Sequence, residues 1–320
     1  MNARPEHLRG ATALVTGGSR GLGLLIAEEL LTRGCRVMIC ARDREELVRA
    51  EEHLAGVGSG EVAATACDLT RPDAPRLLTD AVRHRFGADV ELLVNNAGLI
   101  QVGPLRSLTT REFDRALDLM TTAPLRLTLA VLPAMRAAGR GTIVNITSVG
   151  GRIPAPHLAP YVAAEFALTG LSAVLRAELA ADGISVTTVL PGLMRTGSHR
   201  AAQFAGQPEQ EYAWFAAAAS LPLLSMNAHR AARAVVRAAE HGRPELVLTP
   251  AAKLGTRVYG LAPATTTRAL TLAARLLPGA GPRPARPVRV ARVAAVAERH
   301  PVVAVLTRPG ARAGRRTNEP

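Results

Sequence analysis

Short apolar segments alternate with helical patterns along most of this 320-residue chain, and this alternation restricts the fold more than any other feature. The apolar segments predict seven strands: Thr12–Thr16, Arg36–Cys40, Val62–Cys67, Val90–Val94, Thr142–Thr147, Ile184–Val189 and Glu245–Leu248. The predicted helices between them are Leu22–Arg33, Arg44–Ala55, Asp73–Phe86, Arg111–Ala137, Leu158–Ala181 and Ala228–His241. Strands separated by helices form parallel βαβ units. We therefore expect an α/β fold with a Rossmann-type doubly wound parallel sheet of about seven strands, covered by helices on both faces.

The chain divides into three parts of different composition. No linker interrupts the alternating pattern, so residues 1–250 are predicted to form one domain. The segment 251–278 is rich in alanine and leucine and predicts a helical extension, with Pro263 and Pro278 as helix breakers. Residues 279–320 are rich in proline and arginine, a composition that predicts a disordered tail.

The formal net charge of +13 is partly concentrated in this tail, where nine arginines stand against two glutamates. A strongly basic chain suggests nucleic acid as a partner. No aromatic residues interleave with these arginines, which weakens stacking on single strands. We expect no nucleic acid partner. Weak contact of the tail with an anionic membrane surface and a purely solvated tail both stay open.

The N-terminal and cysteine patterns indicate a cytoplasmic protein. The first ten residues are too polar for a signal peptide, and no segment offers the ~18 uninterrupted apolar residues of a membrane span. Cys35, Cys40 and Cys67 match neither a zinc spacing nor a disulfide framework. Reduced thiols are typical of the cytoplasm, and we expect no metal site.

A glycine-rich turn, Thr16–Gly23, follows the first predicted strand and opens into the first predicted helix. Its glycines permit a tight turn and let the backbone approach a pyrophosphate, whose charge then lies at the helix N-terminus. An ordinary strand-to-helix turn is the alternative. The position between a strand and a helix favours phosphate binding.

Further motifs follow in order along the chain. Asn95-Asn96-Ala97-Gly98 comes after the fourth predicted strand, Ser148 stands thirteen residues before Tyr161, and the segment 191–196 has the pattern PGxxxT. Together with TGxxxGxG at the first turn, these motifs resemble those of the short-chain dehydrogenase/reductase family, over residues 10–250. The resemblance implies the doubly wound fold and an oxidoreductase that uses a nicotinamide dinucleotide.

The resemblance also assigns expected roles to individual positions. Gly17, Gly21 and Gly23 would shape the phosphate loop, Asp68 would hydrogen-bond the adenine, and Thr196 would contact the nicotinamide carboxamide. Asn95 would support the central strands. The full set of expected cofactor-binding residues is Gly17, Ser19, Arg20, Gly21, Gly23, Arg42, Asp68, Leu69, Asn95, Ala97, Gly98, Pro191, Gly192 and Thr196.

The end of the second predicted strand favours NADP(H) over NAD(H). A dinucleotide-binding protein that prefers NAD usually has a carboxylate there to bind the ribose 2′-hydroxyl, but this chain has Ala41 followed by Arg42. Arg42 would form charge-assisted hydrogen bonds with a 2′-phosphate. Arg20 lies in the glycine loop where family members that prefer NADP often carry a basic residue. The alternative is that Arg42 is a solvated residue paired with Glu45 or Glu46.

The expected catalytic residues match the family only in part. In the family a tyrosine moves the proton, a serine orients the carbonyl, a lysine four residues after the tyrosine lowers its pKa, and an asparagine completes a relay. Ser148 and Tyr161 match the first two roles. Glu165 stands at the lysine position and Met120 at the asparagine position. Lys253, the only lysine of the chain, lies beyond the last predicted strand.

Helical spacing places Glu165 beside Tyr161. A carboxylate ~5 Å from the phenol, at an effective dielectric of ~20, disfavours the phenolate by roughly 3 kcal/mol. Three interpretations follow. In the first, Glu165 is protonated and Tyr161 acts as the acid of a reduction. In the second, His157 or Glu165 takes over proton transfer. In the third, the chain binds NADP without turnover.

The region after the PGxxxT motif gathers four of the nine aromatic residues: Phe204, Tyr212, Trp214 and Phe215. In the family this stretch forms a lid over the substrate, so an aromatic lid suggests an apolar small molecule as the substrate. Together with Ser148 and Tyr161, the resemblance implies that the protein interconverts a carbonyl and an alcohol on such a molecule. Packing of these rings onto the core is the alternative. The long predicted helices Arg111–Ala137 and Leu158–Ala181 resemble the surfaces through which the family dimerises, and we expect a homo-oligomer.

Overall fold

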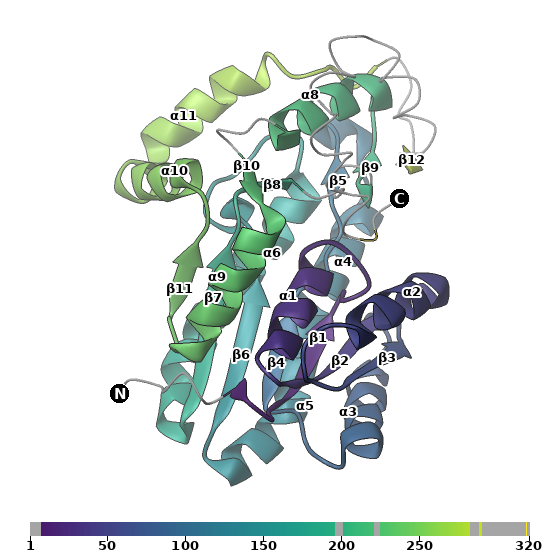
Figure 1. Ribbon diagram of the computed structural model, residues 1–320. Helices are drawn as coiled ribbons and strands as arrows, with labels where there is room; N and C mark the ends of the chain where they lie inside the picture. The colour runs from purple at the N-terminus through teal and green to yellow at the C-terminus, as the bar shows by residue number, and fades with distance from the viewer. Residues whose placement is uncertain (1–7, 196–200, 221–224, 282–287, 290–317, 319–320) are drawn as a thin grey trace.

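A computed structural model describes residues 8–195, 201–220, 225–281, 288–289 and 318 (Figure 1). Seven parallel strands form the central sheet in the order β11-β7-β6-β4-β1-β2-β3. Their bounds are β1 (Thr12–Thr16), β2 (Arg36–Ala41), β3 (Val62–Ala66), β4 (Leu92–Asn95), β6 (Gly141–Ile146), β7 (Ile184–Leu190) and β11 (Glu245–Val247). The predicted Rossmann-type doubly wound sheet is confirmed.

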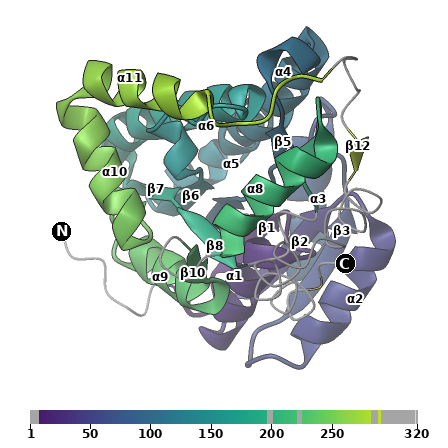
Figure 2. The ribbon, with the colours of Figure 1, turned by 90° about the horizontal axis from the view of Figure 1, so that it is seen from above.

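Helices cover both faces of this sheet, as Figure 2 shows from above. One face packs against α1 (Gly21–Thr32), α2 (Arg44–Ala55) and α9 (Ala228–Glu240). The other packs against α3 (Ala74–Phe86), α5 (Ala123–Ala138) and α6 (Ala159–Glu178). All five residues of β1 are buried, because a central parallel strand has no solvent face. This double burial explains why the strands read as continuous apolar runs.

The strand order reverses at β1, which lies between β2 and β4. From β1 the chain forms β2 and then β3 on one side of β1, and it then crosses over to form β4 on the other side. In open parallel sheets the crevice outside the carboxyl ends of the strands at such a reversal is where ligands bind. Thr16 ends β1 and Asn95 ends β4, so the two motif segments that follow these strands meet at this edge.

The predicted helix Arg111–Ala137 is interrupted in the structure. Its first part is α4 (Thr110–Leu117), which a capping box between Thr109 and Glu112 starts. A π-helical turn, Asp118–Thr122, then separates α4 from α5. The predicted helical stretch is confirmed, since α4, the π turn and α5 follow one another without a gap. Only the π turn was not predicted, because it adds a single residue and the apolar periodicity of the sequence continues through it.

Other elements lie outside the seven-stranded sheet. The helical extension forms α10 (Pro250–Leu261) and α11 (Pro263–Ala274), which separate at the breaker Pro263. A further helix, α8 (Pro208–Ser220), was not predicted. Short strands, also not predicted, form two small sheets: β5 (Gln101–Val102), β8 (Leu193–Arg195), β9 (Gln203–Phe204), β10 (Ser225–Asn227) and β12 (Val288–Arg289). Among the described helices, none has the length and apolar character needed to cross a membrane.

Candidate functional site

The glycine loop between β1 and α1 has a backbone that only glycine adopts easily. Gly17 and Gly21 have φ angles of 65° and 58°. A Cβ atom at Gly23 would lie 2.2 Å from the carbonyl oxygen of Gly17 and 2.4 Å from Nδ2 of Asn96. The loop is therefore packed tightly against the segment that follows β4.

Thr16 and Asn96 hold these two segments together. The Thr16 hydroxyl accepts hydrogen bonds from the backbone N–H groups of Asn96 (2.9 Å) and Ala97 (3.1 Å). The Asn96 side-chain amide donates to the carbonyl oxygens of Thr16 (3.0 Å) and Gly17 (3.2 Å). Sequence reasoning missed both roles, because neither residue was expected to do more than continue its motif.

The N-terminus of α1 is suited to a phosphate. Within the described ranges no side chain caps this end, and the first turn of α1 carries no acidic residue. Its N–H groups and the positive end of the helix dipole therefore remain available to an anion. A Cβ atom at Gly98 would meet no atom within 4 Å, so the space beside Gly98 is open. These residues fit a dinucleotide pyrophosphate.

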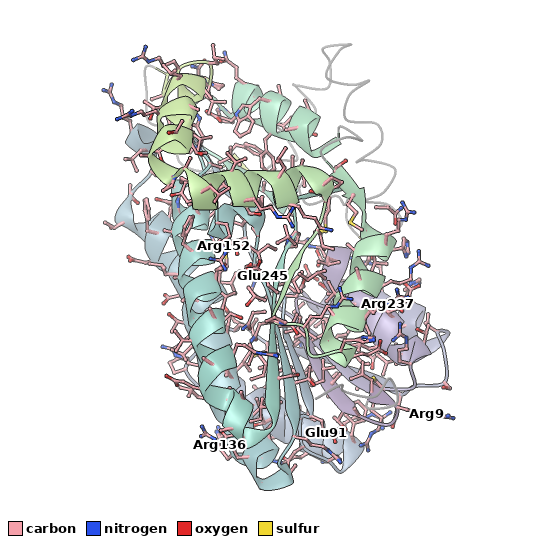
Figure 3. All side chains as sticks on the ribbon, turned by 90° about the vertical axis from the view of Figure 1, so that its left-hand side faces the viewer. Arg9, Glu91, Arg136, Arg152, Arg237 and Glu245 are labelled. Carbon is pink, nitrogen blue, oxygen red and sulfur yellow. The ribbon has the colours of Figure 1, made fainter. Side chains whose placement is uncertain are left out.

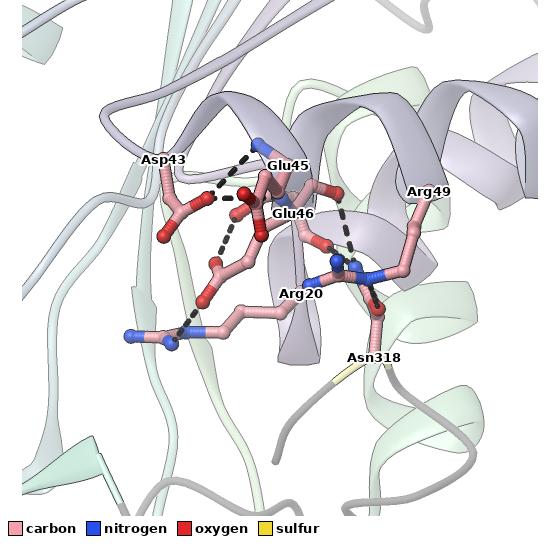
Figure 4. A network of polar contacts seen from close by, with 7 residues as sticks. Arg20, Asp43, Glu45, Glu46, Arg49 and Asn318 are labelled. Carbon is pink, nitrogen blue, oxygen red and sulfur yellow. Dashed lines mark hydrogen bonds and ion pairs between the residues drawn. The ribbon is translucent and has the colours of Figure 1, made fainter.

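Beside the loop, Arg20 and Ser19 are engaged by Glu46 (Figure 4). The Arg20 guanidinium forms an ion pair with Glu46 at 2.9 Å, and the Ser19 hydroxyl donates to the other oxygen of that carboxylate at 3.1 Å. Asn318 lies on the same spot and donates to the backbone oxygens of Ser19 (2.8 Å) and Glu46 (3.1 Å). Arg20 thus already has an anionic partner, which the sequence did not indicate.

Arg42 instead faces an adjoining pocket of about 410 Å³. The pocket is lined by Arg42, Asp68, Thr70, Arg111, Asp114, Arg115, Asp118 and Leu119. Partial burial raises the pKa of Asp68, but hydrogen bonds from Thr70 and the charges of Arg42 and Arg115 outweigh it and hold that pKa below its usual value. Leu69, next in the chain, is buried. Three of these residues are arginines and three are aspartates, so the lining is strongly polar and its formal charges balance.

Asn95 lies in a buried polar chain across the central strands. Its side-chain amide donates to Oδ1 of Asn145 on β6 (2.9 Å), and the Asn145 amide donates to the hydroxyl of Ser172 on α6 (3.0 Å). The Thr188 hydroxyl of β7 donates to the same Ser172 oxygen (2.7 Å). This chain fixes α6, which carries Tyr161, to the middle of the sheet.

Ser148, Tyr161 and Glu165 come together at the start of α6. Ser148 caps the short turn after β6, and its hydroxyl accepts from the backbone N–H of Gly150 at 3.0 Å. Gly150 packs on the Tyr161 ring, where a Cβ atom would lie 3.3 Å from Cε1. The Tyr161 hydroxyl interacts with the hydroxyl of Ser148 and with the carboxyl group of Glu165. Glu165 is only 4% exposed, and its Oε2 atom has no hydrogen-bond partner among the residues that the structure describes.

Burial is the main cause of the pKa shifts of Glu165 and Tyr161. It raises the pKa of Glu165 to about 8, only partly offset by the Tyr161 hydrogen bond. Burial and then the Glu165 charge raise the pKa of Tyr161 well above its ordinary value of 10, and the Ser148 hydroxyl lowers it in part. Glu165 is therefore mostly protonated at neutral pH, and Tyr161 is a phenol rather than a phenolate.

Met120 lies in the π turn that faces α6. Its side chain is 3% exposed and packs in the core with Ala164 and Tyr161. The next residue, Thr121, donates its hydroxyl hydrogen to the backbone oxygen of Ala164 at 3.1 Å. The π turn is thus attached to α6, with an apolar side chain pointing into the core.

His157 links the segment before α6 to α8. Its Nδ1 atom lies 2.8 Å from Oε1 of Glu211, and the Trp214 indole N–H donates to Oε2 of the same carboxylate at 2.7 Å. Glu211 is fully buried. His157 itself has a φ angle of 65°. The sequence singled out His157 but not Glu211, because the partners are 54 residues apart.

The aromatic residues near α8 mostly bury one another. Phe204 contacts Tyr212 and Phe215 edge-to-face, with ring centroids 5.7 and 6.1 Å apart. These three side chains are buried, whereas Trp214 is partly exposed. The cluster matches the packing alternative for these rings and forms a small core of its own.

The segment after β7 closes the site from the other side. The Pro191 carbonyl accepts from the backbone N–H of Val149 at 2.8 Å. A Cβ atom at Gly192 would lie 2.5 Å from Oγ1 of Thr249, so this glycine permits the close approach of the segment before α10. Thr196 lies outside the described residues.

A glycine loop and an open helix N-terminus lie at the reversal of strand order, beside a partly buried serine–tyrosine pair. This combination defines a dinucleotide-binding oxidoreductase. Comparison with known proteins gives the family. Residues 11–205 match the model of the short-chain dehydrogenase family, and the chain belongs to this family, whose members use a nicotinamide cofactor.

Individual relatives agree with this assignment. The chain is 37% identical over 196 residues (61% of this chain, 71% of the other) to a ketoacyl reductase assigned to the granaticin polyketide synthase of Streptomyces violaceoruber. It is 34% identical over 199 residues (62% and 70%) to dehydrogenase/reductase SDR family member 4 of Homo sapiens. A solved short-chain dehydrogenase of Streptomyces avermitilis superposes with a TM-score of 0.70 at 31% identity, covering 83% of this chain and 98% of that one.

Proposed function

We propose that this protein is an NADP(H)-dependent oxidoreductase that interconverts a carbonyl and an alcohol on an apolar small molecule, with Ser148, Tyr161 and Glu165 as its catalytic group. We assign Glu165 to the position of the family's lysine and Met120 to that of its asparagine. The observation that carries the proposal is the Glu165 carboxyl group, buried one helical turn from Tyr161 with an unpartnered oxygen and a pKa of about 8.

A bound nicotinamide supplies the hydride. The Ser148 hydroxyl donates a hydrogen bond to the carbonyl oxygen of the substrate, and the Tyr161 hydroxyl transfers its proton to that oxygen as it gains charge. Protonated Glu165 then returns a proton to Tyr161. The negative charge ends on a carboxylate whose pKa is about 8, rather than on a phenolate whose pKa is well above 10. Because the pKa of Glu165 is the lower of the two, Tyr161 can act as an acid without a neighbouring lysine.

The unpartnered Oε2 atom of Glu165 supports a second role for this side chain. A buried carboxyl oxygen without a partner is costly, and a ligand hydroxyl that bonds it removes that cost. The nicotinamide ribose has hydroxyls of this kind. Glu165 would hold one of them, as the lysine does in the family.

Arg42 supports the choice of NADP(H). It faces the pocket next to Asp68, whereas Arg20 is paired with Glu46. Arg42 is therefore the cation that binds the 2′-phosphate, and Arg20 contributes only if its pair with Glu46 opens. An apolar substrate agrees with the relatives that are named ketoacyl reductases.

The proposal includes a homo-oligomer located in the cytoplasm. Leu129 on α5 and Phe166 and Val174 on α6 are 56%, 37% and 53% exposed, which gives these helices an apolar outer surface. The three cysteines are free and buried, as expected where thiols stay reduced.

A second candidate function is nucleotide binding without turnover, which the buried Met120 side chain favours because it offers no polar atom for a proton relay. The test follows NADPH absorbance with apolar ketones and aldehydes, for the wild type and for Tyr161→Phe and Glu165→Gln. We expect turnover that falls about 10²–10⁴-fold in Tyr161→Phe.

We also expect wild-type reduction to slow as the pH rises through about 8, because Glu165 then loses its proton. Glu165→Gln should lose this pH dependence together with most of the rate. A protein that binds NADPH but reduces no substrate contradicts the proposal and supports the second candidate. Glu165→Lys then tests whether the rest of the site is intact.

A further inference from the structure

The two C-terminal helices expose apolar side chains along their outer faces. On α10, Leu254, Val258 and Leu261 are 66%, 46% and 88% exposed, and their spacing of four and three residues places them on one face. Leu272 on α11 and Leu276, in the turn just after this helix, are 61% and 88% exposed. No residue of α11 is buried. We call these five side chains the leucine face.

Cationic side chains, without acidic ones, accompany the leucine face. Lys253 and Arg257 lie on α10, Arg268 lies on α11, Arg275 directly follows α11, and all four are exposed. The sequence contains no acidic residue between Glu245 and Glu298. Residues 246–320 hold thirteen cationic side chains and two glutamates, and so account for +11 of the net charge of +13.

The opposite side of α10 packs on the protein. Ala252 is buried there, and a Cβ atom at Gly255 would lie 2.8 Å from Cδ1 of Ile153. Figures 1 and 2 show α10 and α11 at the outer edge of the molecule, beyond the layers that cover the sheet. The leucine residues of α10 therefore point away from the side of this helix that packs on the protein.

We propose that α10 and α11 bind the surface of membranes that contain anionic lipids. Exposed leucines on helices rich in cations are the combination that lies in the headgroup region, where apolar side chains insert and cations meet lipid phosphates. A second copy of the chain fits less well, because joining two such faces brings eight cations together with no acid on either pair of helices. The attachment is peripheral and independent of the proposed catalytic activity.

The test measures binding of the full-length protein to vesicles by co-sedimentation. The vesicles are phosphatidylcholine alone or phosphatidylcholine with phosphatidylglycerol, each at low and high salt. We expect binding to the anionic vesicles that weakens with salt. In the variant Leu254→Ser/Leu261→Ser/Leu276→Ser the partition coefficient should fall about tenfold or more.

A matched control removes exposed apolar side chains elsewhere. Val48→Ser/Leu77→Ser/Leu105→Ser changes residues that are 54%, 38% and 65% exposed on other elements, and its binding should equal that of the wild type. Circular dichroism verifies that both variants fold.

The variant Arg315→Gln/Arg316→Gln measures the contribution of the arginine-rich tail, and it should weaken binding less than the loss of the leucines.

Three results would overturn the proposal: no binding to the anionic vesicles, equal binding to neutral ones, or full binding by the leucine variant. A leucine variant that changes only the sedimentation velocity of the protein identifies the face as a contact between copies of the chain instead.

Discussion

The glycine loop and the start of α6 lie at the same edge of the sheet, but they satisfy their polar groups differently. Around the loop, the Thr16 hydroxyl and the Asn96 amide each make several hydrogen bonds with the opposite segment. At the start of α6, one oxygen of the buried Glu165 carboxyl group has no partner in the described part of the chain.

The difference separates scaffold from chemistry. The hydrogen bonds that hold the loop to the segment after β4 are complete without a ligand, and the N–H groups at the start of α1 remain to bind one. The Tyr161 group carries a cost of burial that a bound hydroxyl or a proton relieves. Changes in the loop should therefore act through packing, and changes at Glu165 through protonation.

The largest expected effect is in the loop. Gly23→Ala places a methyl group 2.2 Å from the Gly17 carbonyl, so the backbone must shift, and we expect the free energy of unfolding to fall by about 4 kcal/mol or more with loss of NADPH binding. Gly170→Ala on α6 is the matched control. No atom lies within 4 Å of its added methyl group, and it should stabilise the protein by about 0.5–1 kcal/mol. Denaturant unfolding measures the stability of both variants, and NADPH titration measures their binding. Equal stability of the two variants would show that the glycine loop is not packed as tightly as described.

Much of this contrast could be predicted from the sequence, because it depends on residues close together in the chain. The loop lies between one strand and one helix, and Glu165 follows Tyr161 by one helical turn. Counting residues is enough to place Tyr161 and Glu165 on the same face of their helix.

What the sequence did not indicate depends on contacts between distant segments. Arg20 meets Glu46 on α2, and His157 meets Glu211 on α8, partners that no local pattern connects. The direction of the Glu165 pKa shift also needs the structure, since burial and not sequence position is its main cause.

A smaller effect is expected from removing the Glu165 charge. Its pKa is about 8 in the folded protein and near 4.5 when unfolded, so the folded state holds an extra proton between these values and stability falls as the pH rises through this window. Each pKa unit corresponds to about 1.4 kcal/mol. Glu165→Gln should abolish this fall and be the more stable form above pH 8 by about 2–4 kcal/mol.

Glu178→Gln is the control for this measurement, because Glu178 is exposed on the same helix. Its unfolding curves should keep the pH dependence of the wild type. A wild type whose stability does not change between about pH 5 and about pH 9 would show that Glu165 is not a buried acid of raised pKa.

A more selective effect is expected at Arg42. Arg42→Ala removes one of the three arginines that line the pocket beside Asp68, and the Kd of NADPH should rise about 10–100-fold while that of NADH stays unchanged. Arg44→Ala, an exposed arginine that does not line this pocket, is the control. Glu46→Gln should tighten NADPH binding by releasing Arg20. Equal losses for both nucleotides in Arg42→Ala would assign Arg42 to the shared part of the cofactor.

The smallest effect is expected at the surface near the catalytic segment. Arg152 follows the turn capped by Ser148 and forms an ion pair with Glu245 of β11 at 2.8 Å (Figure 3). Both side chains are more than 40% exposed, so water already solvates them. Arg152→Ala should therefore cost less than about 1 kcal/mol of stability and leave the pH dependence of unfolding intact. If thermal unfolding shows a larger loss, the catalytic segment depends on this pair for its position, and the chemistry at Tyr161 is coupled to the edge strand of the sheet.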